Sequence, residues 1–314
     1  MMDIKGIIGK YKILQKLGSG GFGTVYLAED TILKTERAIK VPHRIGTNTD
    51  KAVQECVVQT KLLDHPNIVK LLTVDIIEGN VLMVMEYIQG TDLEKILDKK
   101  DKLEIKIALK YLRQLLSALD FAHNQKVIHR DIRPSNILIN EEDNIKITDF
   151  GTSTFLTERP YATTRIGSPP YMAPEQFEGR AVFASDIYSA GCLFYEMVSG
   201  LPPIVMANPM EIYKKAKARS YLPLIKKVPS VTQELNSIIN RALEPDITNR
   251  YRYVKEMIDD LDMMGEKKKD NTVEMNEIKK RLEARSVRTD HICWNCRKEM
   301  PSKMNKCLYC GEEQ

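Results

Sequence analysis

Oxygen-bearing side chains are concentrated in the segment from 129 to 136 and shortly after it. The segment has the sequence His-Arg-Asp-Ile-Arg-Pro-Ser-Asn, and an Asp-Phe-Gly triplet follows at 149 to 151. The carboxylate of Asp149 and the amide carbonyl of Asn136 are hard oxygen donors of the kind that Mg²⁺ prefers. Such donors suit a metal-assisted reaction in which the charge on phosphate groups must be neutralised.

A glycine-rich stretch near the N-terminus offers a second place for phosphate groups. Residues 18–25 have the sequence Gly-Ser-Gly-Gly-Phe-Gly-Thr-Val, which contains GxGxxG. A dinucleotide-binding turn would need a helix to begin at the third glycine. Instead, polar and apolar residues alternate from Thr24 onward, which is typical of a strand. The pattern therefore favours a strand–loop–strand flap whose backbone amides cover the phosphates of a nucleotide.

Lys40 lies in the strand-like stretch that follows the glycine-rich flap, in Ala38-Ile39-Lys40. A lysine on a strand is usually just solvated. Its position after the flap and before a helix that carries Glu55 favours a contact with phosphate instead. Glu55 could position Lys40 through an ion pair.

The order of these motifs resembles that of eukaryotic-type protein kinases of the serine/threonine branch. The glycine-rich flap, the Lys40 strand, the 129–136 segment, the Asp-Phe-Gly triplet and Ala173-Pro174-Glu175 occur with kinase-like spacing. The resemblance implies a bilobal α+β fold over residues 11–265. Its parts would be a β-rich N-lobe with one key helix (11–86), a hinge (86–90) and an α-rich C-lobe (91–265).

The resemblance also implies a binding site for ATP and Mg²⁺, with Mn²⁺ as an alternative metal. Asn136 and Asp149 would hold the metal, and Asp131 would orient the attacking hydroxyl group and accept its proton. Lys40 would hold the α- and β-phosphates. The family pattern places the following residues around ATP: Leu17, Gly18, Ser19, Gly20, Gly21, Phe22, Gly23, Val25, Ala38, Lys40, Met85, Glu86, Ile88, Asp92 and Leu138.

Four further positions match supporting roles in the family. Asp186 resembles the buried aspartate that braces the catalytic loop, and Arg250 resembles the arginine that pairs with Glu175. Arg130 resembles an arginine that receives a phosphate from the activation loop, which would order that loop. The best-placed phosphate acceptors are Thr163 and Thr164.

The segment from Gly167 to Glu175 is similar to the substrate loop of serine/threonine kinases, so proteins are the expected substrates. Three features depart from the family pattern. Arg133 stands where these kinases usually have lysine, and its planar fork could alter a γ-phosphate contact. Ser168 replaces threonine. One extra residue separates the Glu55 helix from His65-Pro66. The alternative reading is a catalytically weak nucleotide-binding scaffold.

Four of the six cysteines lie in the last 22 residues, in the pattern CxxC-x10-CxxC. In a reducing compartment this pattern predicts a structural Zn²⁺ site with the ligands Cys293, Cys296, Cys307 and Cys310. We expect a charged linker helix at 266–290 and a small zinc ribbon at 291–314. The ribbon could recruit a protein partner, and targeting of the chain to nucleic acid or protein by the ribbon is a further alternative.

The elements that must position these residues follow from the periodicity. Apolar and polar residues alternate around 11–29 and 36–41, and apolar runs span 68–77 and 81–87. These segments are predicted strands, whereas 51–63 has helical spacing. After Gly90 the pattern is mostly helical, with the clearest helices at 107–122, 186–199, 232–242 and 254–264.

Composition limits the remaining choices. The chain has 314 residues and a net charge of +4, which does not indicate a nucleic-acid partner. The last 50 residues carry 12 basic and 9 acidic residues, and a four-thiolate zinc site would bring their net charge from +3 to about +1. No apolar run approaches the roughly 18 residues of a membrane span, and the N-terminus lacks a secretory apolar region. We therefore expect a cytoplasmic protein with no membrane contact.

Overall fold

The computed structural model divides the chain into two compact units, Met1–Leu261 and Asp262–Gln314. Each unit is described by itself. The structure describes residues 6–20, 23–42, 56–57, 59–62, 64–77, 80–150, 154–155, 167–264, 291–292, 295, 299–300 and 305–313.

A six-stranded antiparallel sheet forms the N-terminal part of the larger unit, with the order β1-β2-β3-β4-β6-β5. Its strands are β1 (Ile7–Ile8), β2 (Tyr11–Gly20), β3 (Gly23–Asp30), β4 (Thr35–Pro42), β5 (Leu71–Ile77) and β6 (Asn80–Glu86). Successive side chains of a strand point to opposite faces. Ile39 of β4 therefore packs with Leu82 and Val84 in one buried cluster, whereas Ala38 packs with Met85 in another.

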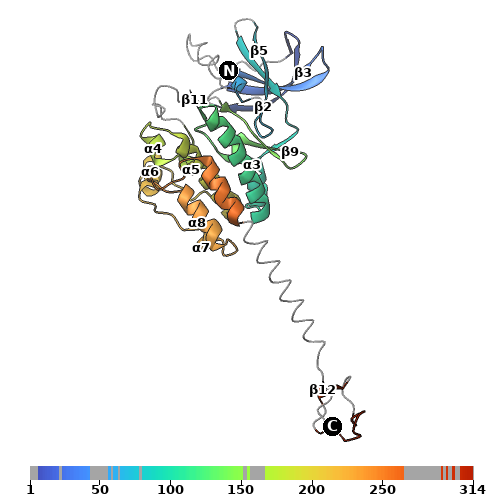
Figure 1. Cartoon of the computed structure of the whole chain (residues 1–314). Helices are drawn as coiled ribbons and strands as arrows, with labels where there is room; N and C mark the ends of the chain where they lie inside the picture. The colour runs from blue at the N-terminus through green and yellow to red at the C-terminus, as the bar shows by residue number, and fades with distance from the viewer. Residues whose placement is uncertain are drawn as a thin grey trace. The chain divides into compact units, whose positions relative to one another are not determined.

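Helices dominate the rest of the larger unit, and Figure 1 shows them gathered on one side of the sheet. They are α2 (Leu93–Lys100), α3 (Ile105–Asn124), α4 (Pro174–Phe177), α5 (Phe183–Ser199), α6 (Pro209–Lys217), α7 (Leu224–Lys227), α8 (Gln233–Ala242) and a last helix at 254–264. The central helix is α5, which packs against α3 and α8 and is buried along most of its length. It ends at Gly200, whose positive φ of 86° closes the helix.

Short strands connect the N-terminal sheet to the helical part and carry some of the candidate site residues. The strands β7 (Gly90–Asp92), β9 (Ile137–Asn140) and β10 (Ile145–Ile147) form a three-stranded sheet, and β8 (Val127–Ile128) pairs with β11 (Thr154–Phe155). Two 3-10 turns, η1 (Pro134–Asn136) and η3 (Pro169–Tyr171), lie nearby. The expected bilobal architecture, a β-rich N-lobe and an α-rich C-lobe, is confirmed.

Several element boundaries differ from those expected from periodicity. The apolar run from Ile68 does not form one strand, because β5 begins at Leu71 and Ile68 makes an isolated parallel bridge to Ile147. Helix α5 begins at Phe183, before Asp186, since the Ser185 hydroxyl accepts the amide proton of Val182. Most of the expected helix at 51–63 and the linker at 266–290 lie outside the described residues.

The smaller unit contains a short hairpin of β12 (His291–Ile292) and β13 (Glu299–Met300). An antiparallel bridge also joins Lys306 to Glu313 across a tight turn. Within the part of the chain that the structure describes, no helix has the length and apolar character needed to cross a membrane.

Gly90 provides a test of the hinge packing. A Cβ atom at this position would lie 1.9 Å from the carbonyl oxygen of Ile139 in β9. Gly90→Ala should therefore separate β7 from β9 and lower the free energy of unfolding by about 1–3 kcal/mol, measured by chemical denaturation. Gly20→Ala is the matched control, because a Cβ there meets nothing within 4 Å. Equal stability of the two variants would contradict the packing described.

Candidate active site

A buried carboxylate organises the backbone of the 129–136 segment. Asp186, on α5, is fully buried and accepts hydrogen bonds from the amides of His129 at 2.9 Å and Arg130 at 2.8 Å. The Nε2 atom of His123 lies 2.8 Å from the same carboxylate. Burial opposes ionisation, but these hydrogen bonds and the neighbouring histidines hold the pKa of Asp186 below its usual value. The segment is therefore anchored to the central helix.

Asp131 lies in a small polar network that joins this segment to the chain around Ser168. The side-chain amide nitrogen of Asn136 donates to the backbone carbonyl of Asp131 at 2.8 Å and to the Asp131 carboxylate at 3.2 Å. The Ser168 hydroxyl donates to the other carboxylate oxygen at 2.8 Å. Arg133 donates from Nη1 to the Ser168 oxygen at 3.0 Å and from Nη2 to Glu94 at 3.3 Å. This network fixes the direction of the Asp131 carboxylate.

Lys40 and Asp149 connect the N-lobe to the C-lobe. The Lys40 Nζ lies 2.7 Å from the Asp149 carboxylate, and only 7% of the lysine side chain is exposed. Asp149 adopts a left-handed backbone with φ of 63°, an unfavourable conformation for a residue other than glycine that is typical of functional sites. Next to it, Phe150 is buried against His129, with 4.6 Å between ring centroids. Phe150 thereby connects the chain next to Asp149 to the 129–136 segment.

The apolar residues expected around an adenine ring share one cluster. Ala38 and Met85 are buried and pair across β4 and β6, and Val25, Ile88 and Leu138 pack against them. These side chains come from both lobes and from the hinge. They form one apolar patch behind the glycine-rich hairpin.

The described part of the glycine-rich flap is a regular antiparallel hairpin between β2 and β3. Gly18 pairs with Val25 and Gly20 with Gly23, and the hydroxyls of Ser19 and Thr24 are 3.0 Å apart. Leu17 lies on the same strand and is 38% exposed. Gly21 and Phe22, at the tip, lie outside the described residues. The sequence expectation of a strand–loop–strand arrangement agrees with this pairing.

Polar contacts hold the hinge at both ends. Glu86 accepts from Lys146 at 2.8 Å and from the amide of Lys70 at 2.9 Å. Asp92, expected to reach a ribose, accepts the amide proton of Lys95 at 2.8 Å and caps α2. Its side chain also pairs with the Lys95 ammonium group, so a ribose would have to share this carboxylate. Lys146 is a residue that the motif pattern does not single out.

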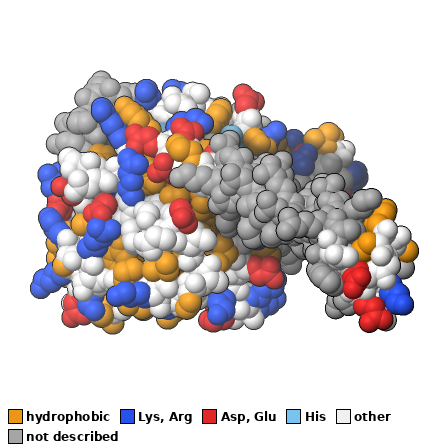
Figure 2. Space-filling model, turned by 60° about the horizontal axis from the view of Figure 1, so that its bottom comes forward, with side chains coloured by type: hydrophobic (Ala, Val, Ile, Leu, Met, Phe, Trp, Pro, Cys, Tyr) orange, Lys and Arg blue, Asp and Glu red, His pale blue; other side chains and the backbone are white. Residues whose placement is uncertain are grey.

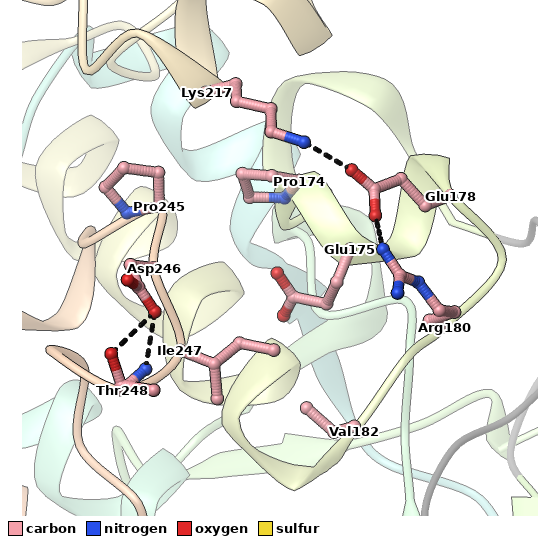
Figure 3. Close-up of a pocket in the computed structure, with 10 residues that line it drawn as sticks. All are labelled: Pro174, Glu175, Glu178, Arg180, Val182, Lys217, Pro245, Asp246, Ile247 and Thr248. Carbon is pink, nitrogen blue, oxygen red and sulfur yellow. Dashed lines mark hydrogen bonds and ion pairs between the residues drawn. The ribbon is translucent and has the colours of Figure 1, made fainter.

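Glu175, the last residue of the substrate loop, forms a buried ion pair with Arg250. The guanidinium donates to both carboxylate oxygens, at 2.7 and 3.1 Å, and the Ser185 hydroxyl adds a hydrogen bond of 2.6 Å. A pocket of about 440 Å³ lies beside the pair. Figure 3 shows Glu178 bound to both Lys217 and Arg180 on its wall. The residues lining this pocket include none of the candidate catalytic side chains.

The substrate loop makes a second contact, partly buried, that the motifs do not reveal. Tyr171 donates to Glu196 of α5 at 2.7 Å. Burial raises the pKa of Glu196 to about 7, against the opposing hydrogen bond from Tyr171. Gln176 adds a bond from its Nε2 to the carbonyl of Arg130 at 2.9 Å. Because all these partners are far apart in sequence, local spacing could not identify them.

Several candidate residues lie outside the described residues, namely Glu55, Thr163, Thr164, Cys293 and Cys296. Arg130, the expected phosphate receiver, is described: its side chain is buried, and burial lowers its pKa to about 10. Among the described residues, no group of three or more His, Cys, Asp or Glu side chains is arranged to hold a metal ion. Only Cys307 and Cys310 of the expected zinc ligands are within that part of the chain.

Cys307 and Cys310 lie at the two ends of a tight turn in the smaller unit. The amide of Tyr309 donates to Cys307 Sγ at 3.4 Å, and the amide of Gly311 donates to the Cys307 carbonyl at 2.9 Å. The side-chain amide of Asn295, which lies between the other two cysteines in the sequence, is 3.8 Å from Cys310 Sγ. Asn295 and Cys310 are therefore neighbours within this unit.

Comparisons with known proteins agree with the geometry. A family model described as "Protein kinase domain" matches residues 11–260. The probable serine/threonine-protein kinase PknB of Lactococcus lactis is 35% identical over 272 residues, which cover 82% of this chain and 43% of that protein. PrkC, a serine/threonine-protein kinase of Bacillus subtilis, is 36% identical over 268 residues, or 83% and 41%. CBL-interacting serine/threonine-protein kinase 16 of Arabidopsis thaliana is 33% identical over 261 residues, or 78% and 55%. The chain thus spans about two-fifths of the length of these bacterial relatives.

The Glu175–Arg250 pair predicts a large effect on stability. Arg250→Met should lower the free energy of unfolding by about 3–5 kcal/mol, because it leaves the buried Glu175 carboxylate without its partner. Lys217→Met is the control: it removes an ion pair of the same 2.7 Å length, but the lysine side chain is 58% exposed. Chemical denaturation should show little change for that variant. Similar losses in both variants would contradict a special role for the buried pair.

Proposed function

This chain belongs to the protein kinase family, and we propose that it transfers the γ-phosphoryl group of MgATP to serine or threonine hydroxyl groups of proteins. The observation that carries the proposal is the 2.7 Å ion pair between Lys40 and Asp149 across the two lobes. This contact supports the proposal because the lysine that would bind phosphates lies next to the carboxylate that would bind the metal. The relatives named as serine/threonine-protein kinases support the substrate class.

The side chains fit the metal that this reaction requires. Asn136 uses its amide nitrogen for Asp131, which leaves its carbonyl oxygen for a metal, and Asp149 supplies a carboxylate. Mg²⁺, or Mn²⁺ in its place, would neutralise charge on the phosphates. The donor set is therefore the one that a hard divalent cation needs.

Asp131 would act on the acceptor hydroxyl. The hydroxyl oxygen attacks the γ-phosphorus, the bond to the β–γ bridging oxygen breaks, and ADP leaves with that electron pair. The proton of the hydroxyl passes to the Asp131 carboxylate. Ser168 and Asn136 aim this carboxylate, while Lys40 would bind the α- and β-phosphates. The cluster around Ala38 and Met85 would enclose the adenine ring.

Regulation by phosphorylation is part of the proposal. A dianionic phosphate on Thr163 or Thr164 would pair with Arg130, whose guanidinium is held inside the protein by the neighbouring fold. Burial of Arg130 gives such a pair a strong electrostatic component, because the local dielectric is low. The expected consequence is an ordered substrate loop.

We also propose that the four C-terminal cysteines bind a structural Zn²⁺. The Tyr309 amide donates to Cys307 Sγ, and Asn295 approaches Cys310 Sγ, an arrangement typical of the outer shell of a thiolate metal site. Four thiolates would complete a tetrahedral site and supply folding energy to this small unit. The site requires reduced thiols, which fits the cytoplasm.

A protein partner suits the smaller unit better than a nucleic acid. Figure 2 shows Lys and Arg side chains interspersed with Asp and Glu over the face of the larger unit that is drawn. The charge of the smaller unit is mixed as well, because the last 50 residues carry 12 basic and 9 acidic residues. Mixed charge of this kind does not produce the basic footprint of a nucleic-acid-binding surface. Recruitment of a protein is therefore the role that we propose for the zinc ribbon.

The kinase proposal is tested with Lys40→Ala and Asp131→Asn. Each should lower phosphotransfer to a protein substrate by about 10²-fold or more, because each removes a group that acts on the reacting phosphates or hydroxyl. Lys110→Ala is the control, since this lysine pairs with Asp143 on the surface. Turnover of radiolabelled ATP is the measurement. A parent that is stabilised by MgATP but never transfers phosphate would instead support the scaffold alternative.

Native mass spectrometry tests the zinc proposal independently of kinase activity. The parent should carry one Zn²⁺ per chain, and Cys307→Ser should lose it, because three thiolates no longer complete the tetrahedral set. Cys56→Ser is the control, as Cys56 lies in the apolar cluster of the N-lobe. A metal-free parent with disulfide-bonded cysteines would overturn the proposal.

A further inference from the structure

Arg133 is the departure from the family pattern that the proposed function leaves unexplained. Its Nη1 donates to Ser168 at 3.0 Å and its Nη2 to Glu94 at 3.3 Å. Ser168 in turn donates to Asp131 at 2.8 Å. A continuous chain of polar contacts therefore runs from Glu94, at the start of α2, to the proposed catalytic base.

The geometry of arginine makes this chain depend on both contacts. A guanidinium is planar and offers donors in a fixed fork, whereas a lysine is a point charge on a flexible stem. The Nε of Arg133 is buried and, among the described residues, has no hydrogen-bond partner. The two Nη contacts therefore determine how the plane of the Arg133 guanidinium group is oriented. If the outer contact is lost, the inner Nη1 is no longer held toward Ser168.

Glu94 is itself well placed to provide the outer contact. The preceding residue, Leu93, is fully buried and fixes the first turn of α2. Asp92 caps the same turn, so the backbone at Glu94 is rigid. The Glu94 side chain is 50% exposed, and the Arg133 side chain is 33% exposed. An ion pair this accessible contributes little to stability, so its effect should appear in the geometry of the site.

We propose that Glu94 is a positioning residue for phosphoryl transfer: its carboxylate holds the Arg133 guanidinium against Ser168, and through Ser168 it aims the Asp131 carboxylate. The inference rests on the proposed kinase function. It assigns a role to the arginine itself, because a planar guanidinium holds its two Nη donors at fixed positions, whereas a lysine presents one point charge on a flexible stem. Glu94 does not touch the reacting atoms and acts only through its neighbours.

Asp98 offers a matched control on the same helix. It lies four residues after Glu94 and hence on the same face of α2. Both carboxylates add to the effect of burial in raising the pKa of Glu196, so both lie near the same partly buried group. A general effect of negative charge would be lost equally in Glu94→Gln and Asp98→Asn. An effect of the specific ion pair would be lost only in Glu94→Gln.

The experiment measures kcat and KM for ATP and for a protein substrate in four single variants and one double variant. Glu94→Gln should lower kcat about fivefold with an unchanged KM for ATP and an unchanged melting temperature. Asp98→Asn should match the parent, and Glu94→Asp should recover part of the loss. In an Arg133→Lys background, Glu94→Gln should cause no further loss, because lysine cannot bridge both partners.

Two results would overturn the inference: equal losses in Glu94→Gln and Asp98→Asn, or an undiminished Glu94→Gln effect in the Arg133→Lys background. A second measurement is independent of turnover. In arginine-labelled protein, the Nη protons of Arg133, assigned with Arg133→Lys, should give separate resonances that merge in Glu94→Gln. A parent without phosphotransfer would contradict the kinase function alone. The resonances would then decide whether Glu94 holds Arg133, and identical spectra of parent and Glu94→Gln would show that it does not.

Discussion

The buried carboxylate of Asp186 is the contact on which the rest of the site depends. An ionised group in the interior is costly unless hydrogen bonds replace its hydration. Here the amides of His129 and Arg130 and the ring of His123 supply those bonds. Because the donors are backbone groups of the catalytic segment, the requirement to satisfy one charge also fixes the path of that segment. Helix α5, buried along most of its length, makes the anchor rigid.

A second constraint joins the two lobes close to this anchor. The Lys40–Asp149 ion pair crosses between them. Backbone contacts reinforce it, because Val69 donates to the carbonyl of Ile147 and Ile147 donates to that of Asn67. The N-lobe therefore meets the C-lobe through β10, two residues before Asp149. These contacts connect the lobe that carries the glycine-rich hairpin to the residues at and just before Asp149.

Side-chain contacts hold the substrate loop in place. Glu175 and Arg250 are buried together, and Tyr171 is hydrogen-bonded to the partly buried Glu196. Ser168 connects this side to Asp131, while Arg133 connects Ser168 to α2. The base thus receives its orientation from three directions: the central helix, the substrate loop and the first helix of the C-lobe. Substitution of arginine for lysine at 133 extends the network by one contact, to Glu94.

The sequence alone determined the lobe organisation and indicated the candidate site residues, because their motifs are local. The glycine pattern, Lys40, Asp131, Asn136 and Asp149 are each recognisable within a few residues, and periodicity located most strands and the long helices. Glu94, Lys146, Glu196 and the Ile68–Ile147 bridge could not be found in this way. Their partners lie about 25 to 80 residues away in the sequence, so no local spacing marks them. Only the tertiary structure brings these groups within hydrogen-bonding distance. Only there does burial decide which contacts the stability of the fold depends on, because an ion pair that is weak in water becomes a structural requirement inside the protein.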